Sequence, residues 1–396
     1  MAVDATAAPQ FTLLALASEM KGLPFIEECK RQGCRVVLLM NEHLRSEPWP
    51  WPSIAEHSSM LDIRRQPDVT VAASRLASRS RIDQIVALDD YDVETAAELR
   101  EHFRLPGMGA SAARLFRDKL AMRVRAHECG VLEPRYTGVF NRDEVRAFLR
   151  EVPAPWVLKP RMLAGSEGIR TLQDAAAVER TLDQLGDRRS NFLLEEHIRG
   201  AVYHVDALVW RSQVVFALAS RYGAPPLTAL QGRGVFSTRS LDNASVEAAA
   251  LRALNERVVL EAMGRTHGPT HTEFICDEAG RFHFLETAAR VAGGHIEKLV
   301  EAASGIVLWR EAARMELALL RGEDYAVPAP AWAYAGLIAA PSRSAYPDTA
   351  VYAEVEIYFR PRLREFVSLI VRSPLAARVD ELLDVYAQRF RQDFMP

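Results

Sequence analysis

The sequence has few cysteines and no long apolar run, and both absences exclude classes of protein. Its 396 residues include four cysteines, none of them in a C-x-x-C pair. A disulfide framework and a cysteine zinc site are therefore not supported, and a reducing compartment is expected. No run of about 18 apolar residues occurs, and the first residues, MAVDATAAPQ, lack the basic flank and apolar core of a signal peptide. We expect no membrane span and a cytoplasmic location.

A strong charge of one sign is also missing. Lys and Arg number 49 and Asp and Glu number 52, which gives a net charge of −3. No long basic run occurs, so nucleic acid and anionic membranes are not expected as partners, and small molecules are. The Walker motif GxxxxGK[ST] and the nucleophile motif GxSxG are absent as well, which excludes a P-loop and a serine-hydrolase elbow.

The elements expected along the chain begin with an α/β pattern. Apolar runs at 11–17, 35–40 and 82–90 predict buried strands, and 22–33 and about 93–103 predict helices. Beyond about residue 108 the pattern changes to α+β. The later expectations are a helical run at 111–130, a strand at 156–159, a helix near 174–185, strands at 191–196 and 202–210, a hairpin at 271–288, a helix near 304–320, strands at 351–359 and 366–371, and a final helix.

Within the predicted hairpin, two glutamates interrupt otherwise apolar strands. If a two- or four-residue turn is centred on 277–280, Glu273 faces Phe284 and His271 faces Glu286. Glu273 and Glu286 are then diagonal neighbours on one face, with Cβ atoms roughly 7–8 Å apart. Such a pair suits a hard cation such as Mg²⁺, and a solvated pair balanced by arginine is the alternative. A three- or five-residue loop would put the two on opposite faces.

Three further segments contain residues that could bind a nucleotide, but each of them taken alone also has an ordinary structural explanation. Lys159 ends an apolar strand before the small-residue loop 164–168, where phosphate oxygens can meet an ammonium and backbone N–H groups; a surface turn is the alternative. Lys119 lies in RDKLAMR and by itself indicates a solvated helix face. The segment NFLLEEHIRG (191–200) indicates either a plain strand end or an interdomain hinge suited to an adenine edge.

The order of these motifs resembles the ATP-grasp fold, and most closely its carboxylate-amine ligase branch, which includes L-amino acid ligases and carnosine-synthase-like enzymes. The resemblance covers about residues 113–316 and rests on Lys119, Lys159 with its loop, LLEEHIRG, HTEF and FLETAAR. The expected fold class is α/β and α+β. It comprises an N-terminal α/β pre-ATP-grasp domain at 1–112, an ATP-grasp module of two subdomains at 113–316 and a small C-terminal α+β region at 317–396.

The resemblance implies a role for each matching residue. ATP would be held through its phosphates by Lys119 and Lys159 under the loop around Ser166, and through adenine by the hinge residues Glu195, Glu196 and Ile198. Mg²⁺, as one or two ions with Mn²⁺ as an alternative, would be bound by Glu273 and Glu286. The reacting carboxylate would be bound by Arg290, with close backbone approach at Gly293 and Gly294. The catalytic residues would be Arg290, Lys159 and Glu273, and His271 and His295 are further candidates for proton transfer.

Two positions depart from the pattern of the resembling family. Many members carry an acid two residues after the hinge glycine to hold the ribose, and this sequence has Val202 there; either Asp206 or His204 substitutes, or the ribose is held less directly. Many also carry Glu-x-Asn before the arginine, with the Asn as a metal ligand, and this sequence has Ala288. The ribose contact and the number of metal ions therefore stay open.

The activity implied is an ATP-dependent ligation of a carboxylate and an amine, both amino-acid-like, through an acyl phosphate. Bicarbonate activation of the biotin-carboxylase or purine-pathway kind is one alternative, and a non-catalytic nucleotide-binding sensor is another. The partners expected are the small-molecule acid and amine, with a homodimer as one oligomeric form. The N-terminal domain and the loop 221–239 are expected to shape the substrate pockets.

Overall fold

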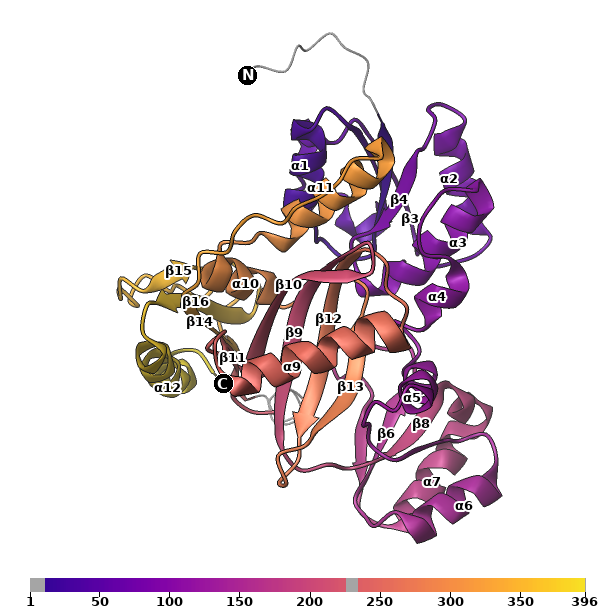
Figure 1. The fold of residues 1–396 in the computed structure, drawn as a ribbon, viewed down its shortest axis with the longest axis vertical. Coiled ribbons are helices and arrows are strands. Elements are labelled where there is room, and N and C mark those ends of the chain that lie inside the picture. The colour runs from indigo at the N-terminus through magenta and orange to yellow at the C-terminus, as the bar shows by residue number, and fades with distance from the viewer. Residues whose placement is uncertain (1–10, 226–233, 396) are drawn as a thin grey trace.

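The computed structural model describes residues 11–225 and 234–395, which build three sheets and their covering helices (Figure 1). The first sheet is parallel, with strand order β3-β2-β1-β4. Its strands and helices are β1 (Thr12–Ala17), α1 (Leu23–Arg31), β2 (Arg35–Asn41), β3 (Glu56–Met60), α2 (Asp68–Ala77), β4 (Gln84–Ala87) and α3 (Val93–Phe103). Parallel strands joined by helices are the βαβ arrangement expected from the apolar runs.

The sequence did not predict β3 and α2. β3 has the sequence EHSSM and lies at the edge of the sheet, where its residues are half-buried or exposed. A polar edge strand lacks the apolar run by which the central strands were identified. The expected strands β1, β2 and β4 and helices α1 and α3 are confirmed.

The second sheet has four strands in the order β5-β8-β6-β7 and is antiparallel throughout. It is preceded by α4 (Ala110–Arg114) and α5 (Lys119–Glu128), and is built from β5 (Tyr136–Gly138), α6 (Arg142–Glu151), β6 (Trp156–Pro160), β7 (Arg170–Leu172), α7 (Ala175–Leu185) and β8 (Phe192–Glu196). Helices α6 and α7 pack on it through a separate apolar core that includes Val145, Phe148, Val178 and Leu182.

The single helical run expected at 111–130 is wrong, because the chain breaks between α4 and α5. Asp118 has extended backbone angles, and its carboxylate accepts hydrogen bonds from the backbone N–H groups of Leu120 and Ala121. An aspartate in this position caps a new helix. Lys119 is therefore the first residue of α5 rather than one turn within a longer helix.

The third and largest sheet has eight strands in the order β13-β12-β9-β10-β11-β14-β16-β15. The strands are β9 (Ala201–Trp210), β10 (Gln213–Tyr222), β11 (Phe236–Ser240), β12 (Gly268–Cys276), β13 (Phe282–Ala288), β14 (Tyr334–Pro341), β15 (Ile357–Phe359) and β16 (Phe366–Ser373). The helices around it are α9 (Val246–Glu256), α10 (Ile296–Ser304), α11 (Leu308–Arg321) and α12 (Ala376–Asp393). Figure 1 shows α9 lying across one face, where Ala248 and Leu251 pack on Val205 and Ala219.

The C-terminal strands continue this sheet instead of forming a sheet of their own. β14 pairs with β11, and helix α11 extends back to the first domain, where Arg314 forms an ion pair with Glu28 of α1 at 2.9 Å. The proposed boundaries at residues 112 and 316 stay predictions, and α11 crosses the second of them. Among the described residues, no helix is long and apolar enough to cross a membrane.

The register of the β12–β13 hairpin differs from the predicted one. The loop has three residues, 278–280, between the bonded pair Asp277 and Arg281, and Gly280 has the left-handed φ of 79° that such loops use. This loop alone would put the two glutamates on opposite faces. A bulge at Leu285 restores the alternation, so Glu273 pairs directly with Glu286 instead of with Phe284. The shared face is confirmed, but the diagonal arrangement is wrong.

Candidate active site

The site begins with three neighbouring strands that place polar side chains on one face of the large sheet. Glu273 of β12 is paired with His204 of β9 on one side and with Glu286 of β13 on the other. Two residues earlier in β12, His271 is paired with Asp206 and with Ala288. Residues that pair directly across strands, and residues two apart along a strand, lie on the same face. Five polar groups and one alanine therefore form a compact array.

Asp206 is fully buried and joins two histidines within this array. Its Oδ1 lies 2.9 Å from Nδ1 of His271, and its Oδ2 lies 2.7 Å from Nδ1 of His204. The other nitrogen of His204 lies 2.8 Å from the hydroxyl of Thr238. The Tyr222 hydroxyl donates a 2.7 Å hydrogen bond to Oε1 of Glu273. Satisfied networks of this kind hold their members in single orientations.

The charges in the network shift two pKa values in opposite directions. Burial alone would raise the pKa of the Asp206 carboxyl, but the two histidines outweigh it and hold that pKa well below its usual range. Burial alone would lower the pKa of His271, but Asp206 and Glu273 raise it to about 9. The network therefore carries a carboxylate flanked by positive charge.

The two predicted phosphate-binding lysines are each held by a carboxylate. Nζ of Lys119 lies 3.2 Å from Oε2 of Glu286 and donates a 2.6 Å hydrogen bond to the Leu163 carbonyl oxygen. Nζ of Lys159 lies 2.6 Å from Oε2 of Glu195. Burial acts to raise the pKa of Glu286, but the charges of both lysines outweigh it and lower that pKa. The lysines thus stabilise the ionised form of the carboxylates.

Arg123 belongs to the same network, and the sequence reasoning missed it. Its side chain is fully buried on α5, and its Nε lies 2.7 Å from Oε1 of Glu195. Glu195 is 1 % exposed, so both of its oxygens are engaged inside the protein by Arg123 and Lys159. Its contact with adenine stays a prediction. The available signal was the spacing of Lys119 and Arg123, which lie four residues apart and hence on one face of α5.

A cavity of about 320 Å³ brings most of the predicted site residues together. This volume lies at the lower end of the range for small-molecule sites, about 300–1,000 Å³. The lining includes all of the predicted ATP and metal residues except His204, namely Lys119, Lys159, Ser166, Glu195, Glu196, Ile198, Glu273 and Glu286. They come from α5, β6, the loop after β6, β8 with the hinge after it, β12 and β13, so the cavity lies between the second and third sheets.

The hinge after β8 lies close to the hairpin. A Cβ atom at Gly200 would lie 1.8 Å from the carbonyl oxygen of Cys276, so only glycine allows this approach. Glu196 accepts a weak 3.4 Å hydrogen bond from the backbone N–H of Arg135, and Ile198 packs with the apolar cluster of Val202 and Ile275. The loop 164–168 has left-handed φ angles at Gly165, Ser166 and Gly168.

The expected ribose contact through His204 or Asp206 stays a prediction, and neither side chain lines the cavity in this structure. Both side chains are 0 % exposed and absent from the cavity lining, and the short contacts to each other, His271 and Thr238 occupy their polar atoms. Val202 itself lines the cavity. Part of the loop 221–239, which we expected to shape a substrate pocket, lies outside the described residues, at 226–233.

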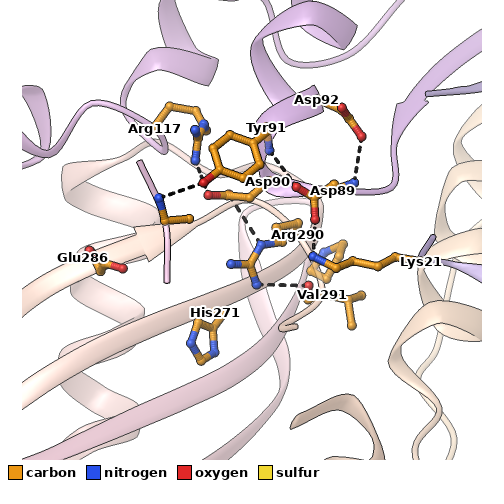
Figure 2. Close-up of polar contacts among 12 residues, drawn as sticks. Lys21, Asp89, Asp90, Tyr91, Asp92, Arg117, His271, Glu286, Arg290 and Val291 are labelled. Carbon is orange, nitrogen blue, oxygen red and sulfur yellow. Dashed lines mark hydrogen bonds and ion pairs between the residues drawn. The ribbon is translucent and has the colours of Figure 1, made fainter. Parts of the chain in front are cut away.

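Arg290 lies beyond the end of β13 and faces the first domain (Figure 2). Its Nε is 3.5 Å from Oδ1 of Asp90, and its Nη1 donates a 3.2 Å hydrogen bond to the Val291 carbonyl oxygen. Asp90 also forms a close ion pair with Arg117, which in turn donates a 2.5 Å hydrogen bond to the Met162 carbonyl oxygen. The predicted carboxylate-binding arginine is thus connected, through one aspartate, to the start of the loop after β6.

Neighbouring residues of the first domain strengthen this connection. The Tyr91 hydroxyl accepts a 3.3 Å hydrogen bond from the backbone N–H of Ala164. Asp89 forms a close ion pair with Lys21, whose Nζ would lie 3.5 Å from a Cβ atom at Gly293. Gly294 has a left-handed φ of 64°. The predicted positions Gly293 and Gly294 therefore lie where the two domains meet, beside Lys21.

Asp92 is the most deeply buried acid of this segment. It is 0 % exposed, and its Oδ2 accepts backbone hydrogen bonds from Ser18 at 3.0 Å and Asp89 at 3.2 Å. Burial is the largest influence and, despite these hydrogen bonds, raises the pKa of Asp92 to about 7. The sequence indicated only that a strand ends in acids here.

The ion pairs of Asp90 predict a strong coupling with Arg117. Both side chains are less than 10 % exposed, so Asp90→Asn leaves a buried guanidinium without its counter-ion. We expect a loss of roughly 3–5 kcal/mol in the free energy of unfolding. Arg117→Gln combined with Asp90→Asn should recover part of this loss, as measured by urea denaturation of the single and double variants. Simple additivity of the two substitutions would contradict the coupling.

The raised pKa of Asp92 predicts a pH dependence of stability. The folded chain keeps this proton up to about pH 7, whereas the unfolded chain releases it near the usual value of 3.8. The contribution of Asp92 to stability is therefore lost as pH rises from about 4 to 7. Relative to the wild type, Asp92→Asn should gain about 1 kcal/mol per pH unit over this interval. Denaturation curves at pH 5, 6 and 7 measure it, and a constant difference between the two proteins would exclude it.

The chain is similar in sequence to known proteins. Residues 152–298 match the model of the ATP-grasp domain. The L-arginine-specific L-amino acid ligase of Bacillus subtilis is 25 % identical over 254 residues, which are 61 % of this chain and 60 % of that protein. The chain spans about half to three fifths of the length of the curated relatives that it matches.

Several solved structures have a similar fold over nearly the whole length of this chain. The crystal structure of the L-amino acid ligase from Bacillus licheniformis has a TM-score of 0.75 at 18 % identity and covers 96 % of this chain and 97 % of that one. The biotin carboxylase domain of the 2-oxoglutarate carboxylase from Hydrogenobacter thermophilus, solved with MgADP and bicarbonate, has a TM-score of 0.70 at 16 % identity, with 96 % and 89 % covered. The expected mixed α/β fold class is confirmed. Residues 152–298 thus match the ATP-grasp domain, and the chain shares the fold of these solved structures.

Proposed function

We propose that this protein is an ATP-dependent ligase that joins a carboxylate and an amine, both amino-acid-like, through an acyl phosphate. The observation that carries the proposal is the position of Arg290, between the cavity-lining hairpin and the first domain. The similarity to amino acid ligases supports the same reaction class.

ATP is proposed to occupy the cavity of about 320 Å³ between the second and third sheets. Its adenine would lie at the hinge near Glu196 and Ile198, with Glu195 beneath it. Its phosphates would lie at Lys119 and Lys159, under the loop around Ser166. The side chains of the two lysines are 8 % and 13 % exposed, and this burial strengthens their attraction for phosphate oxygens.

Glu273 and Glu286 fit the Mg²⁺ ions that accompany ATP in ATP-grasp enzymes. Like charges directly opposite each other on paired strands are destabilising, so this pair gains from a cation between its carboxylates. Carboxylate oxygens are also the donors that Mg²⁺ prefers. When bound, the ions would neutralise charge on the phosphates during transfer. We propose that one or two Mg²⁺ ions bind here, with Mn²⁺ as an alternative ion.

The residues of the chain would act mainly by orientation and charge. Arg290 would hold the reacting carboxylate in line with the γ-phosphate, and Lys159 would stabilise the transferred phosphoryl group. Transfer makes ADP and an acyl phosphate, whose carbon is a better electrophile than that of the carboxylate. The amine then attacks this carbon, the C–N bond forms, and phosphate leaves with the C–O bond electrons; the proton lost by the amine nitrogen passes to the departing phosphate or to a proton-transfer residue. Glu273, His271 and His295 are the candidates for proton transfer.

The proposal also covers the substrates, the domain division, the location and the oligomeric state. The substrates would be a small-molecule acid and a small-molecule amine, and Gly293 and Gly294 would leave room for them beside Lys21. We also propose the division into 1–112, 113–316 and 317–396, a cytoplasmic location and a homodimer. The biotin carboxylase domain from Hydrogenobacter thermophilus was solved as a dimer.

Amine-dependent ADP release tests the proposal. The chain with Mg²⁺-ATP is incubated with a matrix of amino acids and small acids, and products are identified by mass. We expect ADP release for at least one acid–amine pair, with a product of the summed mass minus water. ADP release with bicarbonate and without an amine would support the bicarbonate-activating alternative, and nucleotide binding without release would support a sensor.

Glu286→Gln provides the matched test of the site. Its turnover should fall at least about 100-fold, because the amide neither neutralises Lys119 nor holds a cation as firmly. Glu278→Gln is the control, since Glu278 lies in the exposed loop of the same hairpin. Equal turnover of the two variants would count against the assigned role of Glu286.

A further inference from the structure

His271 lies next to the two proposed metal-binding carboxylates and has no role in the proposed site beyond that of a proton-transfer candidate. It is two residues before Glu273 on β12, and its Nε2 is 3.7 Å from Oε1 of that glutamate. Figure 2 shows His271 and Glu286 on the part of the large sheet that lies below the first domain.

The orientation of the His271 ring is fixed from behind. Nδ1 is bound to Asp206 at 2.9 Å, so Nε2 is the nitrogen left to face Glu273. Asp206 is itself held by His204, whose second nitrogen is bound to Thr238. A histidine that donates one ring N–H to a buried carboxylate presents its other nitrogen as a metal ligand in many proteins. His271 has this arrangement, with its second nitrogen on the side of the carboxylates.

The residue opposite His271 leaves space for such a role. It is Ala288, which is paired directly with His271 across the hairpin. Side chains in such a pair have Cβ atoms roughly 4.5–5.5 Å apart, so the imidazole can extend over the methyl group of Ala288. In the two directly opposed pairs, Glu273 with Glu286 and His271 with Ala288, three residues are potential ligands and Ala288 is the fourth.

We propose that Nε2 of His271 is a third protein ligand of the cation held by Glu273 and Glu286, and that the site therefore prefers Mn²⁺ to Mg²⁺. The inference rests on the proposed function, because it adds a ligand to the same metal site. Mg²⁺ favours oxygen donors alone, whereas a nitrogen donor raises the relative affinity of transition metals such as Mn²⁺. Asp206 is then a positioning residue that holds the ring and its tautomer.

A metal bound by His204, Asp206 and His271 is the competing arrangement. Their ligand atoms all lie within 4.8 Å of one another. However, both oxygens of Asp206 are already bound by the two histidines, and the second nitrogen of His204 is bound to Thr238. Within this cluster, as far as the structure describes it, Nε2 of His271 is the nitrogen directed at Glu273.

The direct test is detection of nitrogen coordination in the full chain. Mn²⁺ is added with a non-hydrolysable ATP analogue, and electron spin echo spectroscopy measures coupling to ¹⁴N. We expect histidine nitrogen coupling in the wild type and its loss in His271→Phe, which keeps a ring of similar volume. His283→Phe is the matched control, because His283 lies in the same hairpin, is buried and is bound to Asp277. It should keep the signal.

Metal affinities provide the second measurement. His271→Phe should weaken Mn²⁺ binding by at least about tenfold and Mg²⁺ binding by less. His271→Phe combined with Ala288→Asn places an amide oxygen opposite, and should restore Mg²⁺ binding without nitrogen coupling. His271→Gln, which can still bond to Asp206, tests the same preference if the phenylalanine variant fails to fold.

The outcomes separate this inference from the proposed function. Mn²⁺ binding with nucleotide but without nitrogen coupling in the wild type would overturn the His271 ligand and leave the carboxylate site intact. Coupling that persists in His271→Phe would overturn it too. Failure of the wild type to bind any divalent cation with nucleotide would overturn the proposed metal site together with its third ligand.

Discussion

The direct pairing of Glu273 with Glu286 is the constraint on which the rest of the site depends. Two carboxylates opposite each other on neighbouring strands repel unless positive charge lies near them. In the folded chain Lys119 contacts Glu286, while Tyr222 donates a hydrogen bond to Glu273. The cap at Asp118, which starts α5 at Lys119, therefore also positions the cation that stabilises the hairpin pair.

The face of this pair was predictable from the sequence, but its register was not. Alternation along the strands needs only the sequence, whereas the register depends on loop length and on bulges. The three-residue loop and the bulge at Leu285 each shift the alternation by one position, and the two shifts cancel. The predicted hairpin had neither the three-residue loop nor the bulge, so it also placed Glu273 and Glu286 on one face. Nothing in the local sequence separates this hairpin from a regular one with a longer turn.

The apolar strands and the order of motifs along the chain were also predictable, because both are local. The contacts that complete the site are not local. Arg290 and Asp90 are 200 residues apart in sequence, and Lys119 and Glu286 are 167 apart; these separations follow from 290 − 90 and 286 − 119. Burial is not local either: the sequence suggested a ribose contact for His204, which stays a prediction, but did not indicate that this side chain is fully buried.

The charge balance of the cavity bears on how a nucleotide would enter. The lining carries three cations, Lys119, Lys159 and Arg199, and five carboxylates, Glu167, Glu195, Glu196, Glu273 and Glu286, so the formal sum is +3 − 5 = −2. A triphosphate alone would bring several more negative charges into this negative, partly buried set, in which both lysines are already paired with glutamates. A cation bound with the nucleotide removes both costs, because it replaces Lys119 at Glu286 and offsets the phosphate charge. The same ion pairs that stabilise the cavity therefore favour binding of nucleotide and metal together over binding of either one alone.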